Sequence, residues 1–126
     1  MDDAGVAAGP VVDGDFTLLG GARAMREILE AREKPDGIFI ASDLMASGAI
    51  PVLLDRGVRI PEDVAIVGYD DSAAALSTEV RLTTVRQPSR EMGWQMADIL
   101  IDVLGGATDR PREVILPTEL VVRDSA

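Results

Sequence analysis

Short apolar runs alternate along this chain with longer segments in which apolar residues recur every three or four positions. The recurrence predicts helices over residues 20–33, 44–56 and 90–104. The short runs predict strands at residues 10–12, 38–41, 64–68, 82–85, 114–116 and 120–122. Strands that alternate with helices in this way are typical of an α/β protein.

The runs at residues 38–41 and 64–68 contain no polar side chain. A strand that is apolar at successive positions is buried on both faces, as strands are in parallel sheets covered by helices. We therefore expect a mostly parallel sheet with helices on both faces. The 126 residues are enough for one domain with a substantial core.

The segment 90–104 differs from the other predicted helices because apolar residues cover most of its circumference. Its polar side chains form one stripe, made of Glu91, Gln95, Asp98 and Asp102. A helix of this kind needs partners on more than one side. From the pattern alone, these partners could lie outside the local sheet, or the helix could fold back onto the local sheet.

The composition narrows the possible functions. The chain has no cysteine and no histidine, which removes disulfide and thiolate chemistry and the commonest general base and metal ligand. The net charge of −10 opposes contact with a phosphate backbone. No apolar run approaches the roughly 18 residues that cross a bilayer, and the first residues lack the features of a signal peptide. We expect a soluble, cytoplasmic chain with no membrane contact.

Polar side chains follow three of the predicted strands, at Asp15-Phe16, Ser42-Asp43 and Asp70-Asp71. In open parallel sheets, ligands bind beyond the carboxyl ends of the strands. Converging carboxylates suit a hydroxyl-rich ligand such as a sugar or a nucleoside, and Phe16 offers a flat face to its apolar side. The alternative is that Asp15 and Asp43 only cap helices and that Asp70-Asp71 is only a turn.

Catalysis is a competing class of function. Paired acids such as Asp70-Asp71 can hold Mg²⁺ for phosphoryl transfer, as in a phosphoacceptor domain or a phosphatase. Such a domain needs a lysine after a late strand, whereas Lys34 is the only lysine and precedes residues 38–41. Gly20-Gly21 lacks the lysine of a phosphate-binding loop. We expect no catalytic residue, no metal and no cofactor.

Four segments, in order and covering nearly the whole chain, resemble motifs of one family. They read PDGIFIASDLMA at residues 35–46, RIPEDVAIVGYDD at 59–71, LTTVRQP at 82–88 and LPTELVVR at 116–123. Together they resemble the lactose-repressor (LacI/GalR) family of transcriptional regulators. The resemblance implies a type I periplasmic-binding-protein fold, in which two Rossmann-like subdomains close on a small effector. It also implies a homodimer that binds operator DNA through a separate N-terminal helix-turn-helix.

The resemblance assigns expected roles to five residues. Phe16 falls where an aromatic ring stacks on the ligand, and Ser42 and Asp43 fall on the family's usual Asn-Asp pair. Asp70 falls on an acid that commonly contacts sugar hydroxyls, and Gln87 falls near the hinge between the subdomains. These residues are the expected ligand-binding set.

The family pattern also implies that segments are missing from residues 1–126. We expect these residues to be the C-terminal portion of the effector-binding domain, with about 90–112 belonging to the other subdomain and no DNA-binding domain present. An interior strand between residues 10–13 and 37–41 is also expected to be absent. The gapped sheet and the unpartnered helix predict a homodimer or an oligomer that exchanges elements. An exported sugar-binding receptor of the same fold is the alternative function.

Overall fold

The computed structural model describes residues 9–32, 34–106 and 113–126. The elements, in chain order, are α1 (Leu18–Glu30), β1 (Gly37–Phe39), α2 (Asp43–Asp55), β2 (Ala65–Asp70), the 3₁₀ helix η2 (Ala73–Leu76), β3 (Thr83–Arg86), α3 (Ser89–Leu104) and β4 (Glu119–Val121). All three predicted helices are present, each with ends within three residues of the predicted ones. No helix in this described part of the chain has the length and apolar character needed to cross a membrane.

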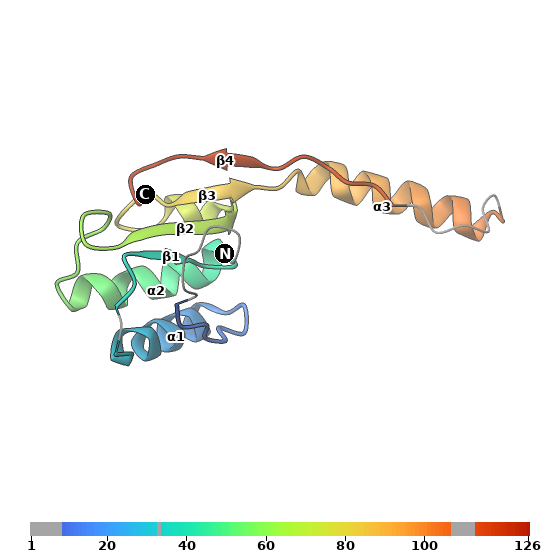
Figure 1. The fold of residues 1–126 in the computed structure, drawn as a ribbon. Coiled ribbons are helices and arrows are strands. Elements are labelled where there is room, and N and C mark those ends of the chain that lie inside the picture. The colour runs from blue at the N-terminus through green and yellow to red at the C-terminus, as the bar shows by residue number, and fades with distance from the viewer. Residues whose placement is uncertain (1–8, 33, 107–112) are drawn as a thin grey trace.

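The four strands form one sheet in the order β1-β2-β3-β4 (Figure 1). The first three strands are parallel and β4 is antiparallel to β3. The predicted α/β class with a mostly parallel sheet is therefore confirmed. Parallel pairing brings the carboxyl ends of β1, β2 and β3 to one edge, where Ser42, Asp43, Asp70 and Gln87 lie at or just after strand ends. Phe16 follows residues 10–12, which form no strand.

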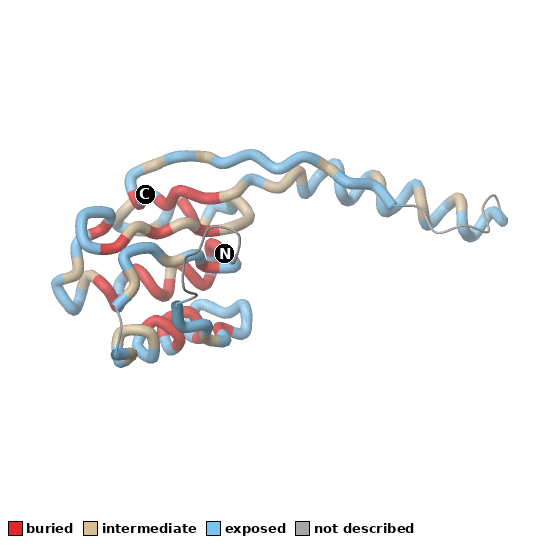
Figure 2. The backbone as a smooth tube through the Cα atoms, in the orientation of Figure 1, coloured by how far each residue is buried: buried red, intermediate tan, exposed pale blue. Residues whose placement is uncertain are grey.

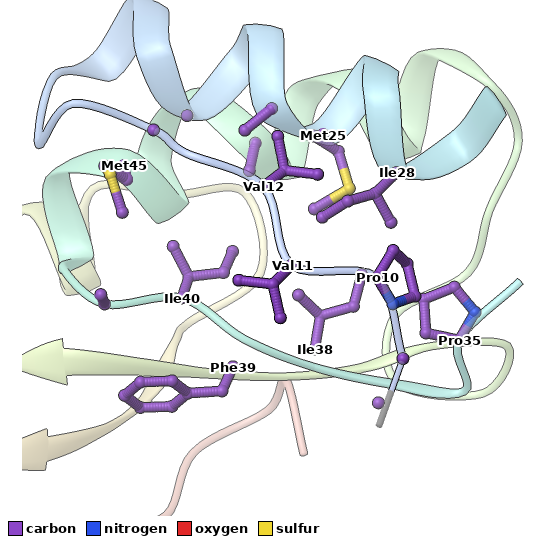
Figure 3. A pocket seen from close by; sticks show the side chains of 17 residues that line it. Pro10, Val11, Val12, Met25, Ile28, Pro35, Ile38, Phe39, Ile40 and Met45 are labelled. Carbon is purple, nitrogen blue, oxygen red and sulfur yellow. The ribbon is translucent and has the colours of Figure 1, made fainter. Parts of the chain in front are cut away.

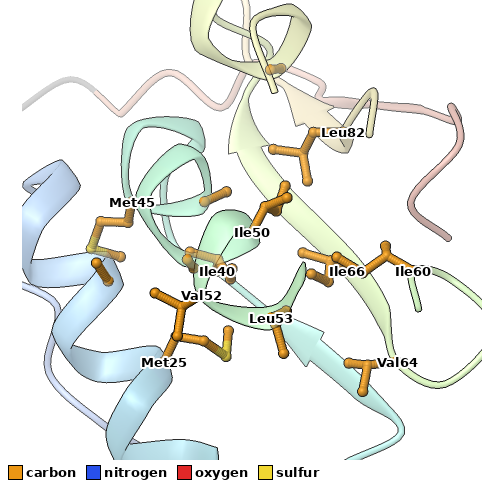
Figure 4. Packing of buried hydrophobic residues seen from close by; sticks show 14 residues of the cluster. Met25, Ile40, Met45, Ile50, Val52, Leu53, Ile60, Val64, Ile66 and Leu82 are labelled. Carbon is orange, nitrogen blue, oxygen red and sulfur yellow. The ribbon is translucent and has the colours of Figure 1, made fainter. Parts of the chain in front are cut away.

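The hydrophobic core surrounds α2. The N-terminus of α2 is capped by Ser42, and its apolar side chains Ile50 and Leu53 are completely buried against Ile66 of β2 (Figure 4). Helix α1 packs beside α2, where Met25 joins the same cluster. The core therefore fixes β2 and α2, the elements from which Asp70 and Asp43 extend.

The opposite face of the sheet carries half-exposed side chains. By the strand register, Phe39, Tyr69, Val85 and Leu120 share this face, with Phe39 62% exposed and Leu120 57% exposed. The rings of Phe39 and Tyr69 meet edge to face, with their centroids 6.4 Å apart. Within the described residues, the packed core lies on the α2 face of the sheet.

Three strand predictions need correction. Residues 10–12 and 114–116 are not in strands, because neither run has a neighbouring strand to pair with. Strand β1 is shorter than the predicted run 38–41 and lies at an edge of the sheet, so it is not buried on both faces as its sequence predicts. An apolar groove of about 390 Å³ lies beside β1, bounded by residues 9–12 and by α1 (Figure 3). The groove lies between residues 9–12 and β1, the two segments between which the family resemblance implies an absent strand, and that absence stays a prediction.

Helix α3 extends away from the sheet, followed by a return to β4 (Figure 1). None of its residues is buried, although it carries several large apolar side chains (Figure 2). The alternative in which this helix folds back onto the local sheet is therefore wrong.

Candidate functional site

Ser42 lies between β1 and α2, Asp43 is the first residue of α2, and both residues are buried. Ser42 is the N-cap of α2, and its Oγ accepts a hydrogen bond from the Met45 amide at 3.2 Å. Ser42 is 6% exposed and Asp43 is completely buried. The N-cap of α2 is thus Ser42 rather than Asp43, for which capping was the alternative role, and any reach of Ser42 toward a ligand stays a prediction.

Both carboxylate oxygens of Asp43 are used inside the protein. Its Oδ1 accepts a hydrogen bond from Thr84 Oγ1 of β3, and its Oδ2 accepts one from the Ser72 amide, each at 2.7 Å. Asp43 therefore joins the start of α2 to β3 and to the loop after β2. Because it anchors that loop, Asp43 acts on the position of Asp70, two residues before Ser72.

Asp70 and Gln87 meet at the edge of the sheet. Gln87 follows β3, and its Nε2 donates a hydrogen bond to Asp70 Oδ1 at 2.6 Å. Burial raises the pKa of the Asp70 carboxyl, and the charge of Asp43 adds to this rise, whereas the hydrogen bond from Gln87 opposes it. The pair offers a carboxylate acceptor beside an amide that both donates and accepts.

Phe16 lies in the loop before α1 and is exposed to solvent, with 67% of the residue accessible. Its neighbour Asp15 accepts hydrogen bonds from Thr17 and from Arg23, whose guanidinium lies 3.1 Å away. The Thr17 and Arg23 hydrogen bonds lower the pKa of Asp15. Among the described residues, no hydrogen bond or ring contact joins Phe16 to Asp70 or Gln87, whereas the latter two are hydrogen-bonded to each other.

Left-handed backbone is concentrated in the predicted site. The non-glycine residues with positive φ in the described chain are Asp15 (48°), Phe16 (56°), Asp70 (114°) and Asp71 (54°). Such conformations are uncommon for residues other than glycine and persist where the surroundings impose them, often at functional sites. Both pairs follow segments that the sequence predicts to be strands, which places the unusual backbone where the sequence predicts ligand contacts.

Two residues important to this edge were not predicted. Tyr69 lines a hollow of about 400 Å³ next to Gln87, together with Met92, Met96 and residues of the return segment 114–118. Thr84 holds Asp43, as described above. Pairing β2 with β3 in parallel would have brought Thr84 near Gly68, but the rotation of Asp43 toward it depends on packing that the sequence pattern does not give.

Asp71 is held by arginines. Its Oδ2 accepts a hydrogen bond from Arg86 Nε at 2.7 Å, and its Oδ1 accepts one from Arg123. Burial alone would raise the pKa of Asp71, but the hydrogen bonds from Arg123 and Arg86 hold the pKa below its ordinary value. An acid pair bound in this way is not arranged as a cation site. No group of three or more acidic side chains in the described residues is placed to hold a metal ion.

Comparisons with known proteins show which proteins this chain is similar to in sequence and fold. Residues 4–126 match the periplasmic binding protein-like domain family. Over 112 residues the chain is 48% identical to the HTH-type transcriptional regulator CelR of Thermobifida fusca, covering 89% of this chain and 33% of that protein.

Two solved structures are similar in fold and sequence. A complex of the transcriptional regulator CelR with cellobiose has a TM-score of 0.91 and 46% identity, covering 98% of this chain and 38% of that chain. A lac repressor dimer bound to operator and the anti-inducer ONPF has a TM-score of 0.79 and 29% identity, covering 89% of this chain and 34% of that chain. The chain thus spans about a third of the length of these relatives.

Proposed function

This chain belongs to the periplasmic binding protein-like domain family, in the form found in LacI-type transcriptional regulators, and we propose that it forms one wall of the effector cleft of such a regulator. The observation that carries the proposal is the Asp70–Gln87 pair, joined at 2.6 Å on the edge of the sheet where ligands of parallel sheets bind. The relatives compared above are transcriptional regulators, which supports a binding function rather than catalysis.

The proposed effector is a carbohydrate. Asp70 would accept hydrogen bonds from sugar hydroxyls, and Gln87 would exchange its bond to Asp70 for one to the ligand. Phe16 would contribute an exposed aromatic face for the apolar side of a sugar ring. Ser42 and Asp43 are buried, so their proposed contribution is to hold the edge in position, with direct contact only if the cleft opens.

We propose that the cleft is completed by a second lobe and that residues 90–112 belong to that lobe. Helix α3 supports this proposal, because it has large apolar side chains and no buried residue. Residues 107–112 lie outside the described residues. Effector binding between the lobes would favour one relative orientation and so alter the affinity of the regulator for operator DNA.

Operator DNA is proposed to contact the regulator only through a helix-turn-helix in the part of the relatives that this chain does not span. The net charge of −10 supports this assignment, since this lobe would be repelled by DNA phosphates. A homodimer, or an oligomer that exchanges elements, is proposed because of the exposed apolar surface. A sugar-binding receptor with no DNA role is the alternative. The similarity to transcriptional regulators supports the regulator over this receptor.

The effector proposal can be tested with cellobiose, the ligand named for one relative. In amide NMR spectra of the isotope-labelled chain, millimolar cellobiose should shift the signals of Asp70, Asp71 and Gln87. Asp70→Ala should weaken this binding about tenfold or more, because a hydrogen bond to a charged group is lost.

The matched control is Asp36→Ala, which removes an exposed acid at the other end of β1 and should leave the affinity unchanged. Equal affinity for cellobiose in a folded Asp70→Ala variant would show that Asp70 is not a ligand contact. Signal shifts restricted to another surface would remove this edge from the proposed cleft.

A further inference from the structure

Two connections leave the sheet toward α3 from neighbouring positions (Figure 1). Arg86 is the last residue of β3, just before the connection to α3, and Glu119 is the first residue of β4, just after the return. The two residues are opposite each other in the antiparallel pair. They therefore mark where the chain leaves this lobe and where it comes back.

The carboxylate of Asp71 is linked to both of these positions. Arg86 donates from Nε to Asp71 Oδ2 at 2.7 Å and from NH1 to Glu119 Oε2 at 3.0 Å. Arg123 donates to Asp71 Oδ1 and, through NH1, to the Leu82 carbonyl at 2.8 Å. We call Asp71, Arg86, Glu119 and Arg123 the crossing clamp. Its two carboxylates balance its two guanidinium groups, so the clamp is electrically neutral.

The members of the crossing clamp differ in their contact with water. The side chains of Asp71 and Arg123 are only 11% and 14% exposed, whereas those of Arg86 and Glu119 are 50% and 68% exposed. Solvent screens exposed ion pairs strongly and buried pairs much less. The Asp71–Arg123 pair is therefore the more rigid part of the clamp. The half-exposed Arg86 side chain links this pair to Glu119, where the chain returns from α3.

The crossing clamp is directly connected to the proposed ligand contact. Asp71 follows Asp70 in the chain, and both residues have positive φ. Arg86 is the register partner of Asp70, and the next residue, Gln87, is hydrogen-bonded to Asp70. Asp70 is therefore directly linked, through its neighbour Asp71 and its partner Gln87, to the residues from which the connections to α3 begin.

We propose that Asp71 is a positioning residue that sets the direction of the two connections, and hence of α3, relative to the sheet. Its coupling to a ligand rests on the proposed function, because it requires effector contact at Asp70. The positioning itself does not, since all of its contacts lie within this chain. Helix α3 has no buried residue, so packing against the core does not fix its direction, whereas the clamp contacts both connections that lead to it.

The experiment measures the distance between α3 and the core in the complete chain. Because the sequence has no cysteine, Arg56→Cys at the end of α2 and Asp98→Cys on α3 give two unique sites for spin labels. Pulsed electron–electron double resonance measures the distance between the two spin labels. With labelled chain diluted in unlabelled chain, it should show one narrow distance peak. Asp71→Asn should abolish that peak and leave a broad distribution. Arg86→Lys should do the same, because a lysine keeps the charge but cannot bridge two carboxylates in a fixed plane.

Glu79→Gln is the matched control, since it removes one negative charge at an exposed loop position outside the clamp and should keep the narrow peak. Circular dichroism of each variant establishes that the lobe is folded. An unchanged narrow peak in folded Asp71→Asn would overturn the proposal. Addition of cellobiose to the unsubstituted chain separates the two ideas: a clamp effect without any response to cellobiose supports the positioning role and contradicts only the ligand assignment.

Discussion

The carboxylate of Asp43 joins three parts of the chain at one point. It is completely buried, and its partners are the Thr84 hydroxyl and the Ser72 amide. A buried donor that loses its partner costs about 1–3 kcal/mol of stability, and more when a charged group was involved. Asp43 therefore stabilises the same edge that carries Asp70.

We predict that Asp43→Ala lowers the free energy of unfolding by about 2–4 kcal/mol, because two buried donors lose their acceptor. Asp43→Asn should cost less, since its carbonyl can accept from Ser72 while its amide donates to the Thr84 hydroxyl. Denaturant unfolding measures both values. Asp36→Ala, at an exposed acid, should change stability by less than about 0.5 kcal/mol. A loss for Asp43→Ala no greater than for Asp36→Ala would contradict this role.

At the scale of elements, the contact between α1 and α2 depends on glycines. A Cβ placed on Gly48 of α2 would lie 1.9 Å from the Leu18 carbonyl oxygen, and one on Gly21 of α1 would lie 2.1 Å from the Met45 carbonyl oxygen. These distances are far inside van der Waals contact, so the two helix backbones touch. The close approach lets Met25 of α1 reach the core around α2.

We predict that Gly48→Ala destabilises the fold by about 1–3 kcal/mol, because the added methyl group must separate the helices. Alanine is otherwise the better helix former by about 1 kcal/mol. Gly93→Ala is the matched control, since a Cβ on Gly93 of α3 meets nothing within 4 Å and should be neutral or stabilising. Thermal or denaturant unfolding distinguishes the two, and a stabilising Gly48→Ala would refute the close contact.

At the scale of the whole molecule, the chain exposes more surface than its mass requires. Its accessible area is 8654 Å², whereas a compact monomer of 13.4 kDa exposes about 6,500 Å². The excess of about 2,200 Å² exceeds the roughly 800 Å² that each partner buries in a standard interface. Exposed apolar side chains of α3 contribute to it, namely Met92, Trp94, Met96, Leu100, Ile101, Val103 and Leu104. This surface is large enough for a stable dimer.

We predict that the isolated chain self-associates at micromolar concentration and that sedimentation velocity detects the dimer. Leu100→Glu on α3 should shift the equilibrium toward monomer by placing a charge in the apolar surface. Leu19→Glu, at an exposed leucine on α1, should have little effect. A monomer at these concentrations in the unsubstituted chain would rule out self-association of this lobe.

The pattern of apolar positions predicted the three helices and the parallel arrangement of the central strands, and the composition excluded histidine and cysteine chemistry. These features depend on local periodicity and composition, which a sequence displays directly. The same pattern predicted strands at residues 10–12 and 114–116, and both predictions were wrong. A strand needs a second strand to pair with, and the local pattern does not show whether one lies nearby. It also predicted that β1 is covered on both faces, although that strand is at an edge.

For the candidate site, the sequence by itself placed Ser42, Asp70 and Gln87 at or after strand ends, and the observed register sets Asp70 opposite Arg86, next to its hydrogen-bond partner Gln87. Only the tertiary structure decided that Asp43 is turned inward, that Asp71 is held between two arginines and that Asp70 and Asp71 adopt left-handed backbone. The physical reason is that strand ends follow from short-range pattern. The direction of a side chain is instead set by distant groups that compete for its hydrogen bonds, here residues up to 52 positions away.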